Sequence, residues 1–180
     1  MTVLDAVLAY LEARRVTAVV IGGVALAVHG IARATWDIDL LVVDRTVLEP
    51  RFWAAWSGPT PDVRPGDADD PLAGVIRFSG ATEPIDVVVG RDPWQRDLLA
   101  RAVPITVGGR RLPVVDAADL VLLKLHAGGL QDLLDIELLV TANVAIGREV
   151  EARLAAVPKD LHALWRTVRS RIDSRGRPPQ

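Results

Sequence analysis

The stretch VVIGGVALAVHGIARATWDIDLLVV, residues 19 to 43, is the part of the sequence that decides the expected fold. A continuous apolar run at its start is typical of a strand covered on both faces. Two glycines then allow a tight turn, because glycine adopts backbone angles that other residues avoid. We therefore predict a buried strand (18–21), a Gly22-Gly23 turn, a short helix (24–29), a loop and a second strand (36–43).

Two carboxylates lie on the second predicted strand. Side chains alternate across a strand, so Asp37 and Asp39 project from one face while Ile38, Leu40 and Val42 point into a core. Two carboxylates on one face repel each other unless a positive charge sits between them. Hard cations such as Mg²⁺ take oxygen ligands from one or two carboxylates together with substrate phosphates. The spacing thus indicates a cation site, with a solvated strand face as the alternative.

A third acid stands in a similar setting later in the chain. Asp86 interrupts the apolar run of EPIDVVVG, residues 83 to 90. A carboxylate that faces a β-branched core is costly to bury without a partner. Three acids that each lie on a predicted strand between aliphatic residues are therefore expected to form one cluster. This cluster favours a functional role for the glycine turn over that of a plain tight turn.

These residues resemble a known superfamily. Gly22-Gly23, then a gap, then Asp37-x-Asp39 between aliphatic residues and Asp86 on a later strand look like the nucleotidyltransferases of the DNA polymerase beta type. Within that superfamily, GGVALAVHGIARATWDIDLLV and the later AADLVLLKLHAGGLQDLLDIELL are similar to abortive-infection nucleotidyltransferase toxins and their small relatives. The resemblance covers roughly residues 18 to 140. It implies an α/β (α+β) nucleotidyltransferase fold, with a mixed β-sheet flanked by helices and a C-terminal helical segment.

The resemblance also implies a set of functional residues. The acids that would bind two Mg²⁺ ions, or Mn²⁺ ions, and carry catalysis are Asp37, Asp39 and Asp86. The residues expected to bind the nucleotide, an NTP such as ATP, are Gly22, Gly23, Arg33, Thr35 and Lys124.

Lys124 lies in a second informative stretch, residues 117 to 142, in which two predicted helices are separated by Gly128-Gly129. A lone lysine on a helix is usually a solvated surface charge, and only the family pattern favours a phosphate contact. Asp132 and Asp135 are neighbours on one helical face. They are expected to support the site, either by bracing the glycine break or by holding Lys124 through charge.

The second stretch departs from the family pattern at one point. Many relatives carry a basic residue just before the Asp132 position, where Leu130 and Gln131 stand here. Arg33 and Arg110 are the candidates that would compensate for the missing charge.

Composition bounds the remaining possibilities. The 180 residues suffice for one domain with a helical appendage, and half of them are apolar with few aromatics, which predicts an aliphatic core. A net charge of -2 gives no global attraction for nucleic acid. The absence of cysteine excludes disulfides, thiolate zinc sites and cysteine nucleophiles. Neither a signal peptide nor a membrane span is recognisable, so we expect a cytoplasmic protein without a membrane partner.

The other expected elements follow from apolar periodicity and turn residues. Residues 57–71, rich in proline and aspartate, predict an exposed loop without the spacing of a calcium site. A basic C-terminal helix with one tryptophan is interpreted as a solvated face, with RNA binding as the alternative. The predicted helices are 3–15 (capped by Thr2), 47–56 (capped by Asp44 or Thr46), 94–102 (capped by Asp92), 117–127 (capped by Asp116, with Asp119 in its first turn), 130–142, and two after Arg148 that divide near Pro158. The predicted hairpins pair 74–79 with 84–89 and 104–107 with 111–115.

Three functional classes fit this pattern. The first is a Mg²⁺-dependent nucleotidyltransferase that transfers NMP from an NTP to RNA, such as tRNA, or to protein, in the manner of a toxin with an antitoxin partner. The second is a small-molecule nucleotidyltransferase of the antibiotic-modifying kind. The third is a non-catalytic nucleotide-binding module, and the presence of all three acids counts against it. The expected parts are a nucleotidyltransferase-like domain (1–145), a C-terminal helical appendage (146–173) and a disordered tail (174–180).

Overall fold

The structure is a computed structural model that describes residues 2–34, 37–80, 83–107 and 109–175. Its internal contacts separate two compact units. The first unit comprises Met1–Ala25 and Arg33–Val115, and the second comprises Leu26–Ala32 and Asp116–Gln180. The predicted domain boundary at residue 145 stays a prediction.

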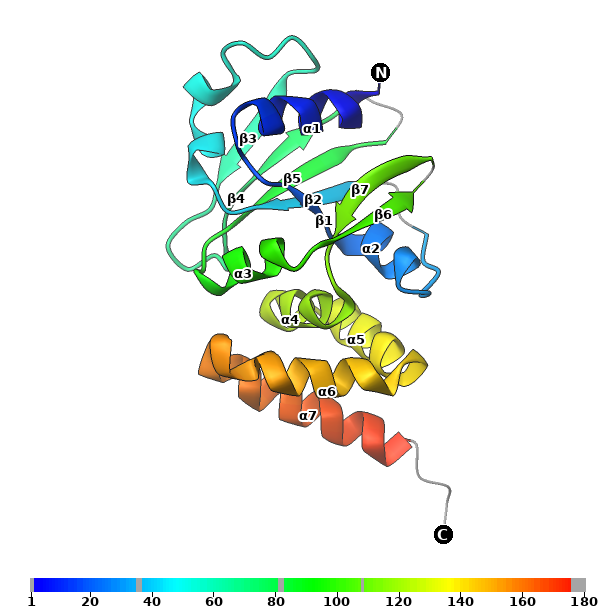
Figure 1. Cartoon of the computed structure of the whole chain (residues 1–180). Helices are drawn as coiled ribbons and strands as arrows, with labels where there is room; N and C mark the ends of the chain where they lie inside the picture. The colour runs from blue at the N-terminus through cyan, green and yellow to red at the C-terminus, as the bar shows by residue number, and fades with distance from the viewer. Residues whose placement is uncertain (1, 35–36, 81–82, 108, 176–180) are drawn as a thin grey trace. The chain divides into compact units, whose positions relative to one another are not determined.

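The first unit is built on a seven-stranded sheet with the order β3-β4-β5-β2-β1-β7-β6 (Figure 1). β1 pairs in parallel with β7, and β2 pairs in parallel with β5, whereas the other neighbours are antiparallel. The predicted mixed sheet is therefore confirmed, as are the two hairpins, β4 with β5 and β6 with β7. The strands are β1 (Val19–Val20), β2 (Ile38–Val42), β3 (Pro61–Pro65), β4 (Leu72–Phe78), β5 (Ile85–Gly90), β6 (Val103–Val107) and β7 (Arg110–Val114).

The central strands of this sheet are covered on both faces. Leu40 and Leu41 are consecutive in β2 and therefore point to opposite faces, yet both are buried. Burial on both faces explains why β1 and the second half of β2 (40–42) are continuous in apolar residues. Leu40 and Val42 face the core as expected, whereas Ile38 at the start of β2 is only half-buried.

The first helix, α1 (Val3–Ala13), begins at Thr2 as predicted. The Thr2 hydroxyl accepts the Asp5 backbone N–H, and the Asp5 carboxylate accepts the Thr2 backbone N–H. This reciprocal capping box satisfies two backbone donors at the start of the helix. The buried residues Leu4, Val7 and Leu11 follow the helical spacing of the sequence.

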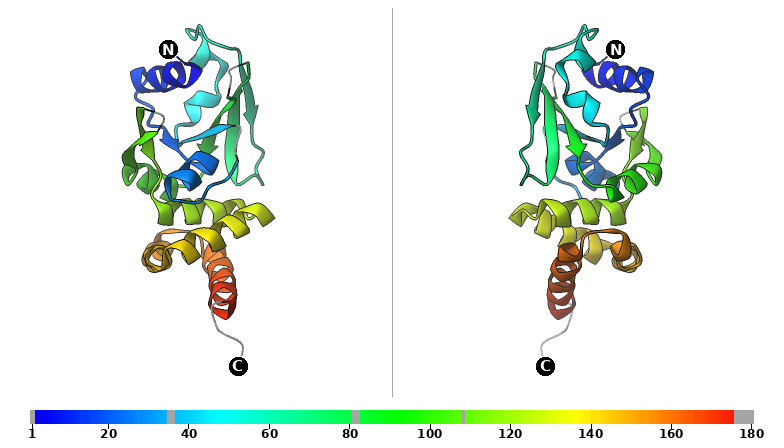
Figure 2. Two further views of the ribbon diagram at one scale, coloured as in Figure 1. Left: turned by 90° about the vertical axis from the view of Figure 1, so that its right-hand side faces the viewer. Right: turned by 90° about the vertical axis from the view of Figure 1, so that its left-hand side faces the viewer.

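The core of this unit contains an aromatic cluster that the sequence analysis did not predict. Tyr10 of α1 stacks on Trp53 with 5.2 Å between ring centroids, and Trp53 also contacts Phe78 of β4 at 5.2 Å. In both views of Figure 2, α1 and the segment that carries Trp53 lie on the same side of β3 and β4. Each aromatic ring buries a large apolar area, so a few of them join three segments that are far apart in the sequence.

The predicted helix 47–56 is wrong. Two short 3-10 helices occupy the region, η1 (Arg45–Leu48) and η2 (Pro50–Trp53). The residue before a proline is driven away from helical angles, and Glu49 accordingly has an extended ψ of 130°. The Asp44 cap is confirmed, because its carboxylate accepts the Thr46 backbone N–H at 2.9 Å.

Three other predictions differ from the structure. The predicted loop 57–71 contains β3, an edge strand with a proline at each end, where a missing N–H removes no ladder hydrogen bond. The helix α3 (Trp94–Ala100) has Pro93 at its N-cap in place of the expected Asp92. The helix α2 (Gly22–Val28) begins at the glycine turn itself, two residues before the predicted start.

The second unit is helical in the part of it that the structure describes. α4 contacts α5, α6 and α7, and Asp116 caps α4 as predicted. The predicted division near Pro158 is confirmed, but α7 continues to Arg175, and residues 176–180 of the predicted tail lie outside the described residues. The elements are α4 (Ala117–Ala127), α5 (Leu130–Ala142), α6 (Val144–Arg153), η3 (Leu154–Ala156) and α7 (Lys159–Arg175). Among the described helices, none combines the length and the apolar character that crossing a membrane requires.

Arg153 of α6 makes ion pairs with both acids at the start of α4. Its guanidinium donates to the Asp116 carboxylate and lies 3.1 Å from Asp119 Oδ1. Asp119 is fully buried, so its charge requires such a partner. Burial raises the pKa of Asp116, but the hydrogen bond and charge of Arg153 outweigh it and hold that pKa below its ordinary value. Besides the predicted cap at Asp116 and the first-turn position of Asp119, both acids therefore take part in ion pairs.

Arg153→Met is expected to lower the free energy of unfolding by about 3 kcal/mol, because the buried Asp119 carboxylate loses this ion pair. Urea unfolding followed by circular dichroism measures the loss. Arg148→Met removes an exposed charge from the same helix and is the matched control. It should change the unfolding free energy by less than about 0.5 kcal/mol.

The pH dependence of that loss is a further check. An acid with a depressed folded pKa contributes stability above its unfolded pKa and loses it as the pH falls through the folded value. The ordinary value for Asp116 is 3.8, and its folded pKa is lower. The difference between wild type and Arg153→Met should therefore narrow below about pH 4. An equal difference in acid and at neutral pH would contradict the ion pair.

Candidate active site

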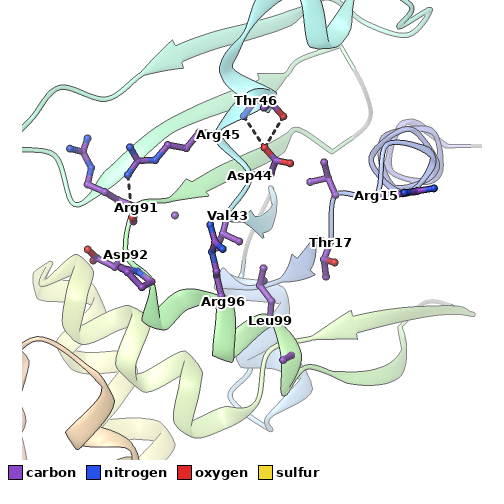
Figure 3. A pocket seen from close by; sticks show the side chains of 14 residues that line it. Arg15, Thr17, Val43, Asp44, Arg45, Thr46, Arg91, Asp92, Arg96 and Leu99 are labelled. Carbon is purple, nitrogen blue, oxygen red and sulfur yellow. Dashed lines mark hydrogen bonds between the residues drawn. The ribbon is translucent and has the colours of Figure 1, made fainter.

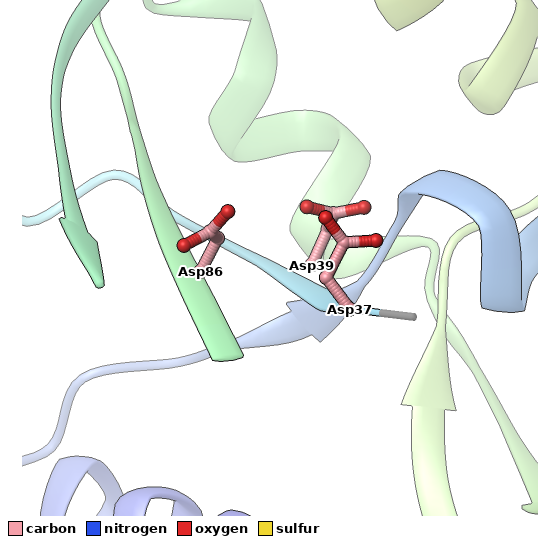
Figure 4. A group of neighbouring side chains, drawn as sticks. All are labelled: Asp37, Asp39 and Asp86. Atoms are coloured by element: carbon pink, nitrogen blue, oxygen red, sulfur yellow. The ribbon is translucent and has the colours of Figure 1, made fainter. Parts of the chain in front are cut away.

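Asp37, Asp39 and Asp86 come together on the central strands of the first unit. β2 and β5 are parallel neighbours, and their register places Asp39 opposite Asp86. Asp37 lies one residue before β2 and two residues before Asp39, so both carboxylates project from the same face. One carboxylate oxygen of each acid lies within 4.8 Å of those of the other two. Figure 4 shows Asp37 and Asp39 side by side, with Asp86 on the neighbouring strand.

Gly22 lies directly against the Asp39 carboxylate. The chain leaves β1 and turns at Gly22 with a φ of +63°, in the left-handed region that favours glycine. A Cβ atom at this position would lie 1.9 Å from Asp39 Oδ2. The Ile21 backbone N–H donates to the Asp39 carbonyl oxygen at 2.9 Å and fixes the approach of the two strands. Only glycine leaves room for the Asp39 carboxylate here.

Arg77 of β4 lies beside the acids, and the sequence analysis missed it. Its Nε is 3.0 Å from Asp86 Oδ1, and its Nη2 is 3.8 Å from Asp37 Oδ2. The antiparallel register of β4 and β5 pairs Arg77 directly with Asp86. This pairing could have been found, because a four-residue connection between the two predicted strands puts residues 77 and 86 opposite each other.

Asp86 has an unsatisfied oxygen despite this neighbour. Its side chain is only 15% exposed, and among the described residues its Oδ1 accepts no hydrogen bond, because Arg77 lies close but is not aligned to donate. Burial raises the pKa of Asp86, and the Asp37 charge raises it further, against the opposing charges of Arg77 and Arg64. A buried carboxylate oxygen without a donor, in a group of three acids, fits a divalent metal ligand. The three acids could therefore hold a metal ion.

The structure says less about the predicted nucleotide-binding residues of the first unit. Gly22 and Gly23 open α2, as the predicted phosphate contact requires, but that contact stays a prediction. Arg33 lies among the described residues, whereas Thr35 lies outside them. Arg110, a candidate for compensating charge, places its Nε 3.2 Å from Asp5 Oδ1.

Lys124 is the centre of a buried polar cluster in the second unit. Its side chain is 8% exposed, and its Nζ donates to Asp132 Oδ1 at 2.9 Å and to Asp135 Oδ2 at 2.7 Å. Gln131 Nε2 donates to the other Asp135 oxygen, and the Gly129 backbone N–H donates to Asp132. Lys124 is thus not a solvated surface lysine, and the cluster braces the glycine break between α4 and α5. Its predicted phosphate contact stays a prediction.

Comparison with known proteins supports the fold. No protein-family model matches the chain, and no curated protein matches it. A crystal structure from Thermotoga maritima, described as a nucleotidyltransferase, superposes with a TM-score of 0.51 and 15% identity over 70% of this chain and 83% of that chain. The solution structure of the antibiotic-resistance factor ANT(2'')-Ia reaches a TM-score of 0.49 and 13% identity over 95% of this chain and 91% of that chain.

The chain therefore has the nucleotidyltransferase fold. The mixed sheet and the first of these similarities show the fold, as the sequence predicted. The acids that the sequence placed in one cluster lie together on this fold and could bind a metal ion.

Gly22→Ala is expected to lower the free energy of unfolding by more than about 2 kcal/mol, because a left-handed backbone and a clash with Asp39 act together. Gly30→Ala is the matched control. Gly30 also has a positive φ, of +88°, but its added Cβ would meet nothing within 4 Å. Both variants carry the strain of a left-handed backbone, so the difference between their thermal midpoints measures the clash with Asp39. Equal losses would show that Asp39 does not constrain this turn.

Arg77→Met is expected to strengthen Mn²⁺ binding by about tenfold, because the guanidinium competes with the ion for the charge of Asp86. Titration calorimetry with Mn²⁺ measures this directly and requires no catalytic activity. Arg111→Met, an exposed arginine on β7, should leave the affinity unchanged. Weaker Mn²⁺ binding by Arg77→Met would mean that Arg77 positions Asp86 for the metal and does not compete with it.

Proposed function

We propose that the chain is a Mg²⁺-dependent nucleotidyltransferase that transfers NMP from an NTP such as ATP to an acceptor hydroxyl. The observation that carries the proposal is the convergence of the three acids, with ligand oxygens within 4.8 Å, on the central strands of a nucleotidyltransferase fold. The sequence pattern of two glycines followed by Asp-x-Asp and a later Asp supports the same activity. All three acids are present, which counts against the third predicted class, a non-catalytic module.

The proposed reaction assigns a role to each group. The bond from the acceptor oxygen to the α-phosphorus forms while the bond from that phosphorus to the bridging oxygen breaks, and pyrophosphate leaves. Asp86, with a pKa raised first by burial, is suited to accept the acceptor's proton at a carboxylate oxygen. Two Mg²⁺ ions held by the three acids would stabilise the negative charge on the attacking and leaving oxygens. The residues proposed to hold the triphosphate are Gly22, Gly23, Arg33, Thr35 and Lys124.

The cavity beside Asp86 does not discriminate between acceptors by charge. It has a volume of about 290 Å³, and its charged lining residues are Arg64, Asp70, Arg77 and Asp86, two of each sign. The acceptor is therefore proposed on the family resemblance alone, which places RNA, such as tRNA, first, a protein second and a small-molecule antibiotic third. The toxin role, the antitoxin partner and the cytoplasmic location are proposals that depend on the family resemblance and on sequence alone.

Incubation of the purified chain with each NTP labelled in its α-phosphate, Mg²⁺ or Mn²⁺, and total tRNA or cell extract tests the proposal. Label is expected on an RNA species, only in the presence of the divalent ion. Label on protein or on an added aminoglycoside would reassign the acceptor. Absence of transfer to every acceptor, together with metal-dependent NTP binding, would establish the non-catalytic module instead.

Asp39→Asn is expected to reduce transfer by on the order of 100-fold or more, because one of three charged ligands is lost. Without metal, its thermal midpoint should equal or exceed that of wild type, since one of three mutually repelling charges is removed. Asp69→Asn neutralises an exposed aspartate away from the cluster and should leave both quantities unchanged. A large drop in the midpoint of Asp39→Asn would indicate a structural acid in place of a metal ligand.

A further inference from the structure

A second cavity in the first unit lies at the opposite ends of the same strands. The acids stand at the starts of β2 and β5, whereas this cavity of about 1010 Å³ is lined by Val43 and Gly90, where these strands end, and by Thr17, which precedes β1. Val43 follows Asp39 by four residues, or about 13 Å along a strand. A ligand in this cavity would therefore bind apart from the acids.

The wall of the cavity is rich in arginine. Of the two carboxylates in the wall, Asp44 is turned toward η1, where it accepts the Thr46 backbone N–H at 2.9 Å and the Thr46 hydroxyl at 2.7 Å. The guanidinium groups outnumber the carboxylates by two to one. The charged residues of the wall are Arg15, Asp44, Arg45, Arg91, Asp92 and Arg96.

The arginines of the wall differ in the hydrogen bonds that they already make. Arg91 donates to the carbonyl oxygens of Ala68 and Leu72, at 3.1 and 3.0 Å, and so supports the chain around it. Arg45 donates to the Arg91 carbonyl oxygen at 3.1 Å (Figure 3). Figure 3 also shows Arg96 extending from α3 toward Val43. Within the residues that the structure describes, neither Arg45 nor Arg96 forms an ion pair with a carboxylate. These two guanidinium groups remain available to an anion.

Arg15 occupies a backbone position that glycine would fill at lower cost. It follows the end of α1 with a φ of +60°, the one positive value recorded for a described non-glycine residue. The Val16 backbone N–H donates to the Leu11 carbonyl oxygen at 2.9 Å, which is the hydrogen bond of a Schellman motif with glycine as its usual residue. Arg15 is one of the residues that line the cavity, but in Figure 3 its side chain extends away from Arg45, Arg91 and Arg96. The case for an anion therefore depends on the other arginines of the wall.

We propose that this cavity binds a phosphate-bearing anion of about nucleotide size. A planar guanidinium matches phosphate oxygens with two parallel donors, and a concave site strengthens the field of its charges. The volume lies at the upper end of that of small-molecule sites. The phosphates can belong to a free polyphosphate or to a nucleic-acid backbone, since both present the same chemistry. The proposal does not depend on the nucleotidyltransferase activity.

Titration of tripolyphosphate into the full chain, with a chelator present so that the acids stay free of metal, tests the proposal. Binding is expected to weaken as salt concentration rises. Arg96→Gln and Arg45→Gln should each weaken it by about tenfold, as expected for the loss of a charge-assisted contact. The matched control Arg111→Gln removes an exposed charge from β7 and should have no effect. Asp39→Asn should also have no effect, which separates this site from the proposed active site.

Arg15→Gly is a control for stability. Glycine relieves the left-handed backbone, so the thermal midpoint should rise while tripolyphosphate affinity stays unchanged, because the Arg15 side chain points away from Arg45 and Arg96.

Competition with a short single-stranded RNA identifies the source of the phosphate. Displacement of tripolyphosphate by RNA, sensitive to Arg96→Gln, would assign the cavity to a nucleic-acid backbone, and its absence would assign it to free polyphosphate. Failure of wild type to bind tripolyphosphate, or equal binding by wild type, Arg45→Gln and Arg96→Gln, would overturn the proposal.

Discussion

Gly22 has no side chain, and the Asp39 carboxylate lies where one would be. This contact joins the end of β1 to the start of β2 and lets the chain turn there in a left-handed conformation. The register of β2 with β5 then brings Asp86 opposite Asp39, and the register of β5 with β4 brings Arg77 opposite Asp86. The arrangement of the acidic cluster thus depends on one position at which no larger residue fits.

The grouped acids of the two units differ in how completely they are hydrogen-bonded. In the second unit, Lys124 lies between Asp132 and Asp135 and satisfies both with short hydrogen bonds. In the first unit, Arg77 approaches Asp86 without donating to its buried oxygen. A buried polar cluster that is fully paired stabilises a fold, whereas one that lacks a donor is open to a ligand. This pairing explains how the lysine cluster braces the glycine break between α4 and α5, and the unsatisfied Asp86 oxygen is consistent with the metal site proposed for the three acids.

The sheet of the first unit also carries opposite charges at its two ends. The starts of β2 and β5 bear the acids, and the segments that follow their ends bear Arg45, Arg91 and Arg96. Each end of the central strands therefore offers a different chemistry. We propose cations at one end and anions at the other, on strands whose apolar middle is buried between them.

The sequence by itself determined the central strands, the glycine turn, both hairpins and the grouping of Asp37, Asp39 and Asp86. These features depend on local patterns, namely apolar runs, turn residues and the two-residue period of a strand. It did not determine the 3-10 segment before Trp53, the edge strand β3 or the aromatic cluster, because proline context and contacts between distant segments decided them. The burial of Lys124, the partnership of Arg153 with Asp119 and the gathering of arginines around one cavity came only from the tertiary structure. A charged side chain has the same sequence pattern whether it is solvated, paired or poised for a ligand, and only its neighbours in space distinguish the three.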